Sequence, residues 1–331
     1  MSATKILSEW KKKQFKPVYW LEGEEAYYID LLVDYAEHHL LSEADAGFNL
    51  TLFYGKDASW ADVLNACRRY PMFAERQVVI LKEAQQMRDL EKLEPYIAQP
   101  QPTTVFIVAH KEKKLDGRSS MAKLLKKNAE VFLSEKLYDN KVPAWIQELA
   151  EEKGYQINQK AVQLLADHIG NDLSRIANEL DKLMVNVPDK STITEAHIET
   201  YVGISKEYNV FELQAAIGRK DLPKAIQIIQ YFEGNPKAAP IQLVLPSLYS
   251  FFSKTYMLFG LQGDDKTLAA QMGIHPFFLK DYRQAASIYG FPGIETAILL
   301  LQSYNLRAVG VNDAGTPDAA LLKEMLCKLM A

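Results

Sequence analysis

The chain has 331 residues, of which 48% are apolar and 24% carry a charged side chain. This length and apolar content support two or three folded domains and exclude a disordered regulator. The formal net charge of −4 gives no general attraction to polyanions, so any contact with nucleic acid has to come from a local basic patch.

The cysteines and the most apolar segment bear on the compartment. Cys67 and Cys327 lie far apart, belong to no CxxC pair and fall in helical patterns, so we expect two small buried thiols in a reducing compartment. The N-terminus lacks the apolar core of a signal peptide. Residues 241–261 are interrupted by Pro246 and Lys254 and are too polar for a membrane span. We therefore expect a cytoplasmic protein with no membrane partner.

In the first part of the chain, short β-rich runs alternate with amphipathic helical ones. The predicted strands are residues 17–23, 48–55, 76–81, 103–110 and 130–134, and the predicted helices lie near 25–40, 59–69, 89–97 and 118–127. Strands that are apolar almost throughout are typical of a parallel sheet covered on both faces. We predict a doubly wound α/β domain of about five strands over residues 1–138.

Beyond residue 138 the strand signal disappears, and apolar residues recur with the helical period of about 3.6 residues. Gly154, Gly170 and Gly203 stand where helices are expected to end. We predict a small helical domain over residues 139–205. A third, all-helical domain is predicted over residues 206–331, where several helices are apolar on more than one stripe and are expected to pack on two sides.

The α/β domain lacks the residues of a phosphate-binding loop. Such a loop needs GxxxxGK[ST], whose backbone N–H groups and lysine bind the phosphates. Here Glu24 and Glu25 follow Gly23 after the first predicted strand, where they suit a helix N-terminus and repel a triphosphate. After the third predicted strand, Lys82 stands where a metal-binding acid is expected, and only Glu83 remains. We predict that this domain does not bind ATP.

We find no other catalytic or metal-binding pattern in the sequence. There is no GxSxG and no HExxH motif. His38 and His39 are adjacent, so on a helix their rings diverge by about 100° and do not share a metal easily. We expect no catalytic residue, no metal site and no cofactor, which describes a non-enzymatic protein on an enzyme-like scaffold.

Five segments together resemble one protein family. They are PVYWLEGEEAYYID, YPMFAERQVVIL, KKLDGRSSMAKLLKK, DLSRIANELDKL and VFELQAAIGRKDLPKAIQII, spread over residues 16 to 235. Their order and spacing resemble the delta subunit of the bacterial DNA polymerase III clamp loader. The resemblance implies an AAA+ architecture: a RecA-like domain without a phosphate-binding loop, a small helical lid and a helical collar that joins a ring of subunits.

The resemblance also implies a function and partners. A delta subunit binds the ring-shaped sliding clamp and opens it, so that the clamp is loaded on primed DNA in chromosomal replication. The implied partners are the clamp, the ATPase and delta-prime-type subunits held through the collar, and primer-template DNA. The polymerase activity of the holoenzyme resides in another subunit. Asn305 and Val309 depart from the pattern of many members, so the last helices are expected to pack somewhat differently in the collar.

Met72 and Phe73 stand between a helix-stopping proline and a predicted buried strand. In the family, a hydrophobic pair at a helix tip of the first domain inserts into a pocket of the clamp, and the resemblance assigns this role to Met72 and Phe73. The surrounding residues agree, because Ser59 and Asp62 indicate a helix start and Pro71 forces the chain out of the helix. The alternative is that both side chains pack under the sheet.

A basic stretch follows the fourth predicted strand. Its cations are Lys111, Lys113, Lys114, Arg118, Lys123, Lys126 and Lys127. One interpretation is a patch that contacts the phosphates of primer-template DNA. The other is a solvated face, as most charge runs are.

Two other functions stay open for the whole chain. One is an active AAA+ ATPase with a degenerate nucleotide site. The other is a stand-alone DNA-binding protein, which the net charge of −4 disfavours.

Overall fold

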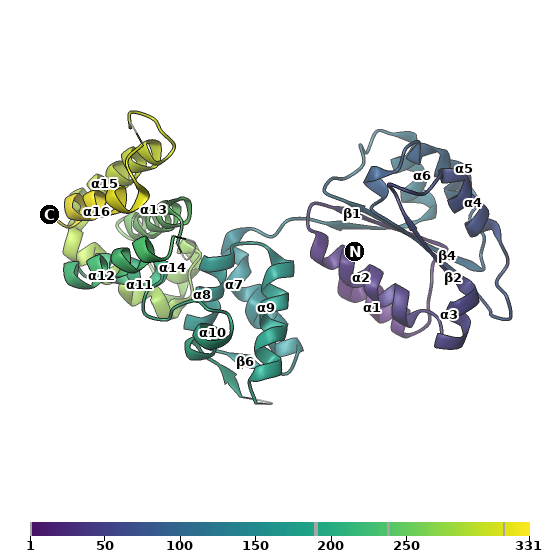
Figure 1. Cartoon of the computed structure of the whole chain (residues 1–331), viewed down its shortest axis with the longest axis horizontal. Helices are drawn as coiled ribbons and strands as arrows, with labels where there is room; N and C mark the ends of the chain where they lie inside the picture. The colour runs from purple at the N-terminus through teal and green to yellow at the C-terminus, as the bar shows by residue number, and fades with distance from the viewer. Residues whose placement is uncertain (1, 189–190, 237–238, 314) are drawn as a thin grey trace. The chain divides into compact units, whose positions relative to one another are not determined.

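The computed structural model describes residues 2–188, 191–236, 239–313 and 315–331 (Figure 1). The chain divides into two compact units, Met1–Leu137 and Tyr138–Ala331. None of the helices in the described ranges combines the length and apolarity needed to cross a membrane.

The first unit is built on a parallel sheet. Its strands are β1 (Val18–Gly23), β2 (Leu50–Tyr54), β3 (Gln77–Lys82), β4 (Thr104–Lys111) and β5 (Glu130–Ser134), in the order β2-β3-β4-β1-β5. At the start of β3 and β4, Gln77 lies opposite Thr104, and at the end of β1 and β5, Gly23 lies opposite Ser134. The predicted five-stranded α/β domain is confirmed.

Helices cover both faces of this sheet (Figure 1). They are α1 (Ala3–Lys11), α2 (Ala26–His39), α3 (Glu43–Asn49), α4 (Trp60–Arg68), α5 (Glu94–Ala98) and α6 (Ser120–Asn128). One core holds Ile6 and Ile29 from α1 and α2, and the other holds Val63 and Leu125 from α4 and α6. The sequence did not predict α1 or α3, and α3, with 7 residues, is too short for a legible helical period.

The second unit is helical except for two short strands, β6 (Gln156–Ile157) and β7 (Thr192–Ile193), which pair in parallel. The expectation that strands end at residue 138 is wrong here, because two residues leave no alternation to detect. The helices are α7 (Val142–Glu152), α8 (Gln159–Ile169), α9 (Leu173–Asn186), α10 (Glu195–Tyr201), α11 (Val210–Gly218), α12 (Leu222–Gly234), α13 (Ile241–Met257), α14 (Asp265–Met272), α15 (Leu279–Ala308) and α16 (Asp318–Met330). The division of this unit near residue 205 stays a prediction.

The two cysteines differ in burial. Cys67 is buried in α4, and its burial raises the pKa of the thiol. Cys327 is exposed on α16, so the prediction of two buried thiols is wrong for it. Leu326 and Leu329 of the same helix are buried, and Cys327 lies on the other side of the helix.

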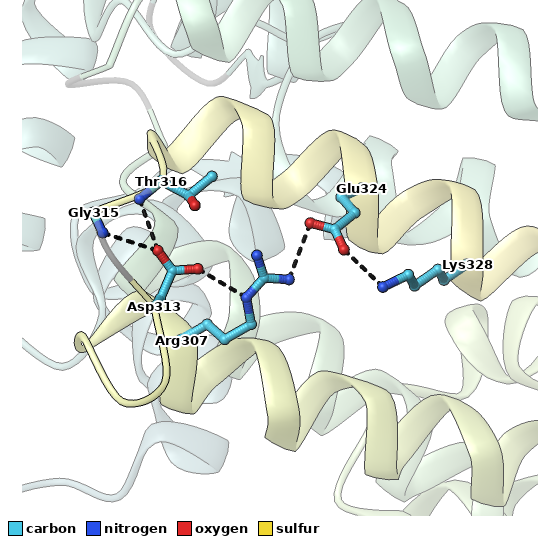
Figure 2. A network of polar contacts seen from close by, with 6 residues as sticks. All are labelled: Arg307, Asp313, Gly315, Thr316, Glu324 and Lys328. Atoms are coloured by element: carbon cyan, nitrogen blue, oxygen red, sulfur yellow. Dashed lines mark hydrogen bonds and ion pairs between the residues drawn. The ribbon is translucent and has the colours of Figure 1, made fainter.

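A network of charged side chains joins the end of α15 to α16 (Figure 2). Arg307 donates from Nε to Asp313 Oδ2 at 2.9 Å and from Nη1 to Glu324 Oε2 at 3.0 Å. Lys328 Nζ donates to Glu324 Oε1 at 2.7 Å. The backbone N–H of Thr316 and the Arg307 guanidinium lower the pKa of Asp313 to about 2. Lys328 and Arg307 likewise lower the pKa of Glu324 to about 2.

Asn305 and Val309, which depart from the family pattern, are both exposed near the end of α15. Neither belongs to the core of this unit. Their effect on contacts with other subunits stays a prediction.

Candidate functional site

The chain between α4 and β3, residues 69–76, forms a turn at the edge where the parallel strands begin; we call it the α4–β3 turn. Helix α4 starts at the N-cap Ser59, whose Oγ accepts the N–H of Asp62 at 3.2 Å. The helix ends at Arg68, ahead of Pro71. The prediction that Met72 and Phe73 follow a helix end is therefore confirmed.

Both side chains of the predicted pair point to solvent. Met72 is 53% exposed and Phe73 is 98% exposed, so the alternative of packing under the sheet is wrong. Phe73 has φ of 57°, in the left-handed region. This conformation costs a residue with a Cβ about 1–2 kcal/mol, and such strain clusters at binding sites. An exposed phenylalanine held in this way is a candidate binding residue.

Asn49, the last residue of α3, contacts this turn from the side. Its side chain is buried, and its Oδ1 accepts the N–H of Met72 at 2.7 Å. Its Nδ2 donates to the Met72 carbonyl at 2.9 Å and to the Asp45 carbonyl at 3.1 Å. The amide therefore pairs with both backbone groups of Met72. Sequence reasoning missed Asn49, because it placed this residue inside a strand and nothing local indicates a contact 23 residues away.

Gln77 and Thr104 bind the last turn of α4 from inside the domain. Gln77 Nε2 donates to the carbonyls of Ala66 at 3.0 Å and Arg69 at 2.6 Å. Thr104 Oγ1 donates to the carbonyl of Cys67 at 2.9 Å. The last carbonyls of a helix have no partner within it. These two buried strand residues supply partners and fix the end of α4.

At the opposite edge, the segment after β1 occupies the position of a phosphate-binding loop. Gly23 has φ of 132°, and a Cβ on it would lie 2.0 Å from the Ser134 carbonyl oxygen. That carbonyl accepts the N–H of Glu25 at 3.2 Å, and the buried Glu25 carboxylate accepts the N–H of Tyr27 at 2.9 Å. The predicted capping role of Glu25 is confirmed. Two N–H groups at the start of α2 are thus bound within the protein.

Ion pairs lie beside this edge. Lys82 pairs with Glu37, and Lys111 Nζ lies 2.6 Å from Asp30 Oδ1 and 2.9 Å from Glu83 Oε1. Burial opposes ionisation of Glu83, but the contacts with Lys111 outweigh it and lower the pKa of Glu83. Lys111 is therefore held by two carboxylates of its own domain, unlike the rest of the basic stretch.

The other cations of the basic stretch lie in the loop before α6 and on α6. All are exposed: Lys113, Lys114, Arg118, Lys123, Lys126 and Lys127. Arg118 contacts Asp116, with Nε to Oδ1 at 3.2 Å. Three lysines share α6, where the buried Met121 and Leu125 occupy the other side. These three lysines are the part of the stretch that the structure brings together.

His38 and His39 end α2 with ring centroids 6.4 Å apart, and His38 Nδ1 lies 2.9 Å from the carbonyl of Asp34. Among the described residues, no group of three or more His, Cys, Asp or Glu is arranged to hold a metal ion.

The chain is similar to known proteins over nearly its whole length. Residues 19–135 match the family model described as DNA polymerase III, delta subunit. DNA polymerase III subunit delta of Bacillus subtilis (strain 168) is 26% identical over 329 residues, covering 95% of this chain and 93% of that protein. The probable DNA polymerase III subunit delta of Aquifex aeolicus (strain VF5) is 24% identical over 280 residues, covering 80% of this chain and 77% of that protein.

A solved structure shares the fold. The Bacillus subtilis DNA clamp loader delta protein (YqeN) matches with a TM-score of 0.54 at 24% identity, covering 99% of each chain. The resemblance carried by the five sequence segments is confirmed by the family model and by the two curated relatives. Over residues 19–135 the chain matches the family of DNA polymerase III delta subunits, and its similarity to two relatives described as delta subunits extends over most of its length.

Proposed function

We propose that this protein binds the ring-shaped sliding clamp through the α4–β3 turn and opens it, so that the clamp is loaded on primed DNA. Similarity to DNA polymerase III delta subunits over most of the chain supports a clamp-loader component in DNA replication. The observation that supports the finer mechanism is the exposure of Met72 and Phe73 on a turn whose backbone is held by buried side chains.

The two side chains provide enough binding energy for this role. Full burial of a Met or Phe side chain contributes about 1.5–3 kcal/mol. Together they correspond to a change in clamp affinity of about 10²–10⁴-fold. Opening requires more than affinity, because a ligand shifts an equilibrium only as far as it prefers one state. Met72 and Phe73 therefore bind the opened clamp interface more tightly than the closed one.

ATP hydrolysis in this proposal belongs to partner subunits. Support comes from the carboxyl edge of the sheet, where Glu25 and Ser134 occupy the N–H groups that a phosphate would need. The protein is then a binding and mechanical subunit that needs no cofactor of its own. The DNA polymerase activity of the holoenzyme resides in another subunit.

The helical unit connects the protein to its partners in this proposal. Residues 139–205 form a lid in this proposal, and a collar at residues 206–331 joins the ATPase and delta-prime-type subunits. The lysine face of α6 (Lys123, Lys126 and Lys127) contacts primer-template DNA in the assembly. Lys126→Glu with Lys127→Glu should then weaken DNA binding by the assembled loader and reduce its salt dependence. Unchanged binding and unchanged salt dependence would rule out this contact.

The mechanism is tested by release of clamp from closed circular DNA. Wild-type protein should accelerate release, and the double variant Met72→Ala with Phe73→Ala should not. Because both side chains are largely exposed, the melting temperature of the variant should stay nearly unchanged. A folded wild-type protein that leaves the clamp on the DNA would contradict the proposal. A large fall in melting temperature would assign the pair to the core instead.

A further inference from the structure

The side-chain amide of Asn49 is buried and bonds the α4–β3 turn, although Asn49 belongs neither to the apolar core nor to the proposed clamp contact. It sits at the end of α3, next to the start of β2, and is only 3% exposed. An asparagine at a helix end commonly points to solvent or binds its own helix. Here Asn49 binds the carbonyl of Asp45 in its own helix and also both backbone groups of Met72.

The side-chain amide satisfies both backbone groups of Met72, because it carries a donor and an acceptor. The N–H of Met72 requires an acceptor at 2.7 Å, and the Met72 carbonyl requires a donor at 2.9 Å. An ionised aspartate supplies acceptors only, and alanine supplies neither. Loss of the amide therefore leaves Met72 without its partners on that side.

The Met72 backbone controls the next residue. Phe73 has φ of 57° and is 98% exposed, so its own side chain makes little contact that would hold this strained conformation. The hydrogen bond at the Met72 N–H fixes the peptide before Met72, and the one at the Met72 carbonyl fixes the peptide that enters Phe73. Without these hydrogen bonds the turn is free to relax to other conformations. Binding of a partner then has to order the turn, which lowers the affinity.

We propose that Asn49 is a positioning residue for clamp binding, which holds the α4–β3 turn in the conformation that presents Phe73. This inference rests on the proposed function of the turn. It predicts that Asn49 acts on the clamp only through the turn that carries Met72 and Phe73, and touches no part of the clamp itself.

The first test is a double-mutant cycle. Clamp affinity is measured by surface plasmon resonance for wild type, Asn49→Ala, Phe73→Ala and the double variant. Asn49→Ala should weaken binding about 10-fold, and its effect should be clearly smaller once Phe73 is alanine, because only Met72 is then left to position. A residue that merely stabilises the domain would weaken binding by the same factor in both backgrounds, and that result would overturn the proposal.

The second test does not depend on the clamp. Hydrogen exchange of peptides covering residues 70–76 should be faster in Asn49→Ala at the Met72 amide, because its acceptor is gone. Asn49→Asp keeps an acceptor for this N–H and should exchange more slowly than Asn49→Ala. If Asn49→Ala does not fold, Asn49→Asp replaces it in both tests.

Asn128 provides a matched control, because it is also the last residue of a short helix in the same unit. Asn128→Ala should leave exchange in the turn and clamp affinity unchanged. Unchanged exchange in Asn49→Ala would overturn the positioning role. If the wild type does not bind the clamp, or if Phe73→Ala binds it as tightly as the wild type, the proposed function is refuted. The exchange measurement would still show whether Asn49 orders the turn.

Discussion

The two edges of the parallel sheet use buried polar groups in opposite ways. At the carboxyl edge, the Ser134 carbonyl and the Glu25 carboxylate bind backbone N–H groups that a nucleotide site would leave free. At the amino edge, the buried Asn49 and Gln77 hold backbone groups so that Phe73 stays exposed. At the carboxyl edge the hydrogen bonds occupy the groups that would bind a phosphate. At the amino edge they hold the turn that exposes Phe73.

This difference shows how a fold can keep its architecture while its binding site moves. In open α/β sheets, ligands usually bind at the carboxyl ends of the strands. Here that position is filled by the protein's own groups, and the candidate binding residues stand where the strands begin. The position of the candidate binding residues therefore depends on buried side chains that hydrogen-bond the backbone of the α4–β3 turn, and not on the fold alone.

The largest effect on stability is expected at the amino edge. Gln77→Leu removes the donor to the carbonyls of Ala66 and Arg69 at the end of α4. The Ala66 carbonyl still accepts the N–H of Arg69, whereas the Arg69 carbonyl loses this partner. The free energy of unfolding should fall by about 1–3 kcal/mol, measured by urea denaturation. A loss below about 0.5 kcal/mol, typical of a surface substitution, would show that this amide does not hold the end of α4.

A smaller effect is expected at the carboxyl edge. Glu25→Ala removes the N-cap of α2 and should cost about 0.5–2 kcal/mol. Neither the wild type nor this variant should bind ATP and magnesium in isothermal titration, because the Ser134 carbonyl still occupies the loop position. Saturable micromolar binding by the wild type would contradict the closed edge and restore the alternative of an active ATPase.

Phe73→Gly should separate stability from function. Glycine relieves the left-handed strain at φ of 57° but adds entropy to the unfolded chain, so the net gain should be about 0.5–1 kcal/mol. The same variant should lose clamp binding. Met72→Gly is the matched control, because Met72 has no positive φ and should lose stability. A destabilised Phe73→Gly would show that the phenylalanine packs against the domain.

The smallest effect is expected in the helical unit. The pKa of Glu324 is lowered from 4.5 to about 2, so its ionised form stabilises the folded state above pH 4.5. This contribution disappears as the pH falls towards 2. Glu324→Gln should therefore show a flatter fall in melting temperature between about pH 5 and pH 2 than the wild type. Equal slopes would show that the network of Figure 2 adds nothing measurable.

Much of the first unit could be predicted from local sequence. Apolar runs identify the strands, and Pro71 separates Met72 and Phe73 from the preceding helix. The exposure of the pair could not be decided from composition, because apolar residues beside a strand are usually buried.

The supports of the turn could not be predicted, because they depend on tertiary register. Asn49 meets Met72 across 23 residues, and Gln77 meets Thr104 across 27. Their polar character alone predicts turns or exposed positions. Cys327 was misassigned for a similar reason, since a helical pattern apolar on several sides does not show which side is covered.

The most direct test is binding of the purified chain to the sliding clamp of its own organism without ATP, with wild type beside Phe73→Ala. If the α4–β3 turn contacts the clamp, the wild type should bind tightly and the variant should lose at least about 10-fold in affinity, with both proteins equally folded. Equal binding by the two proteins, or none by a folded wild type, would contradict the assignment of the α4–β3 turn as the clamp contact.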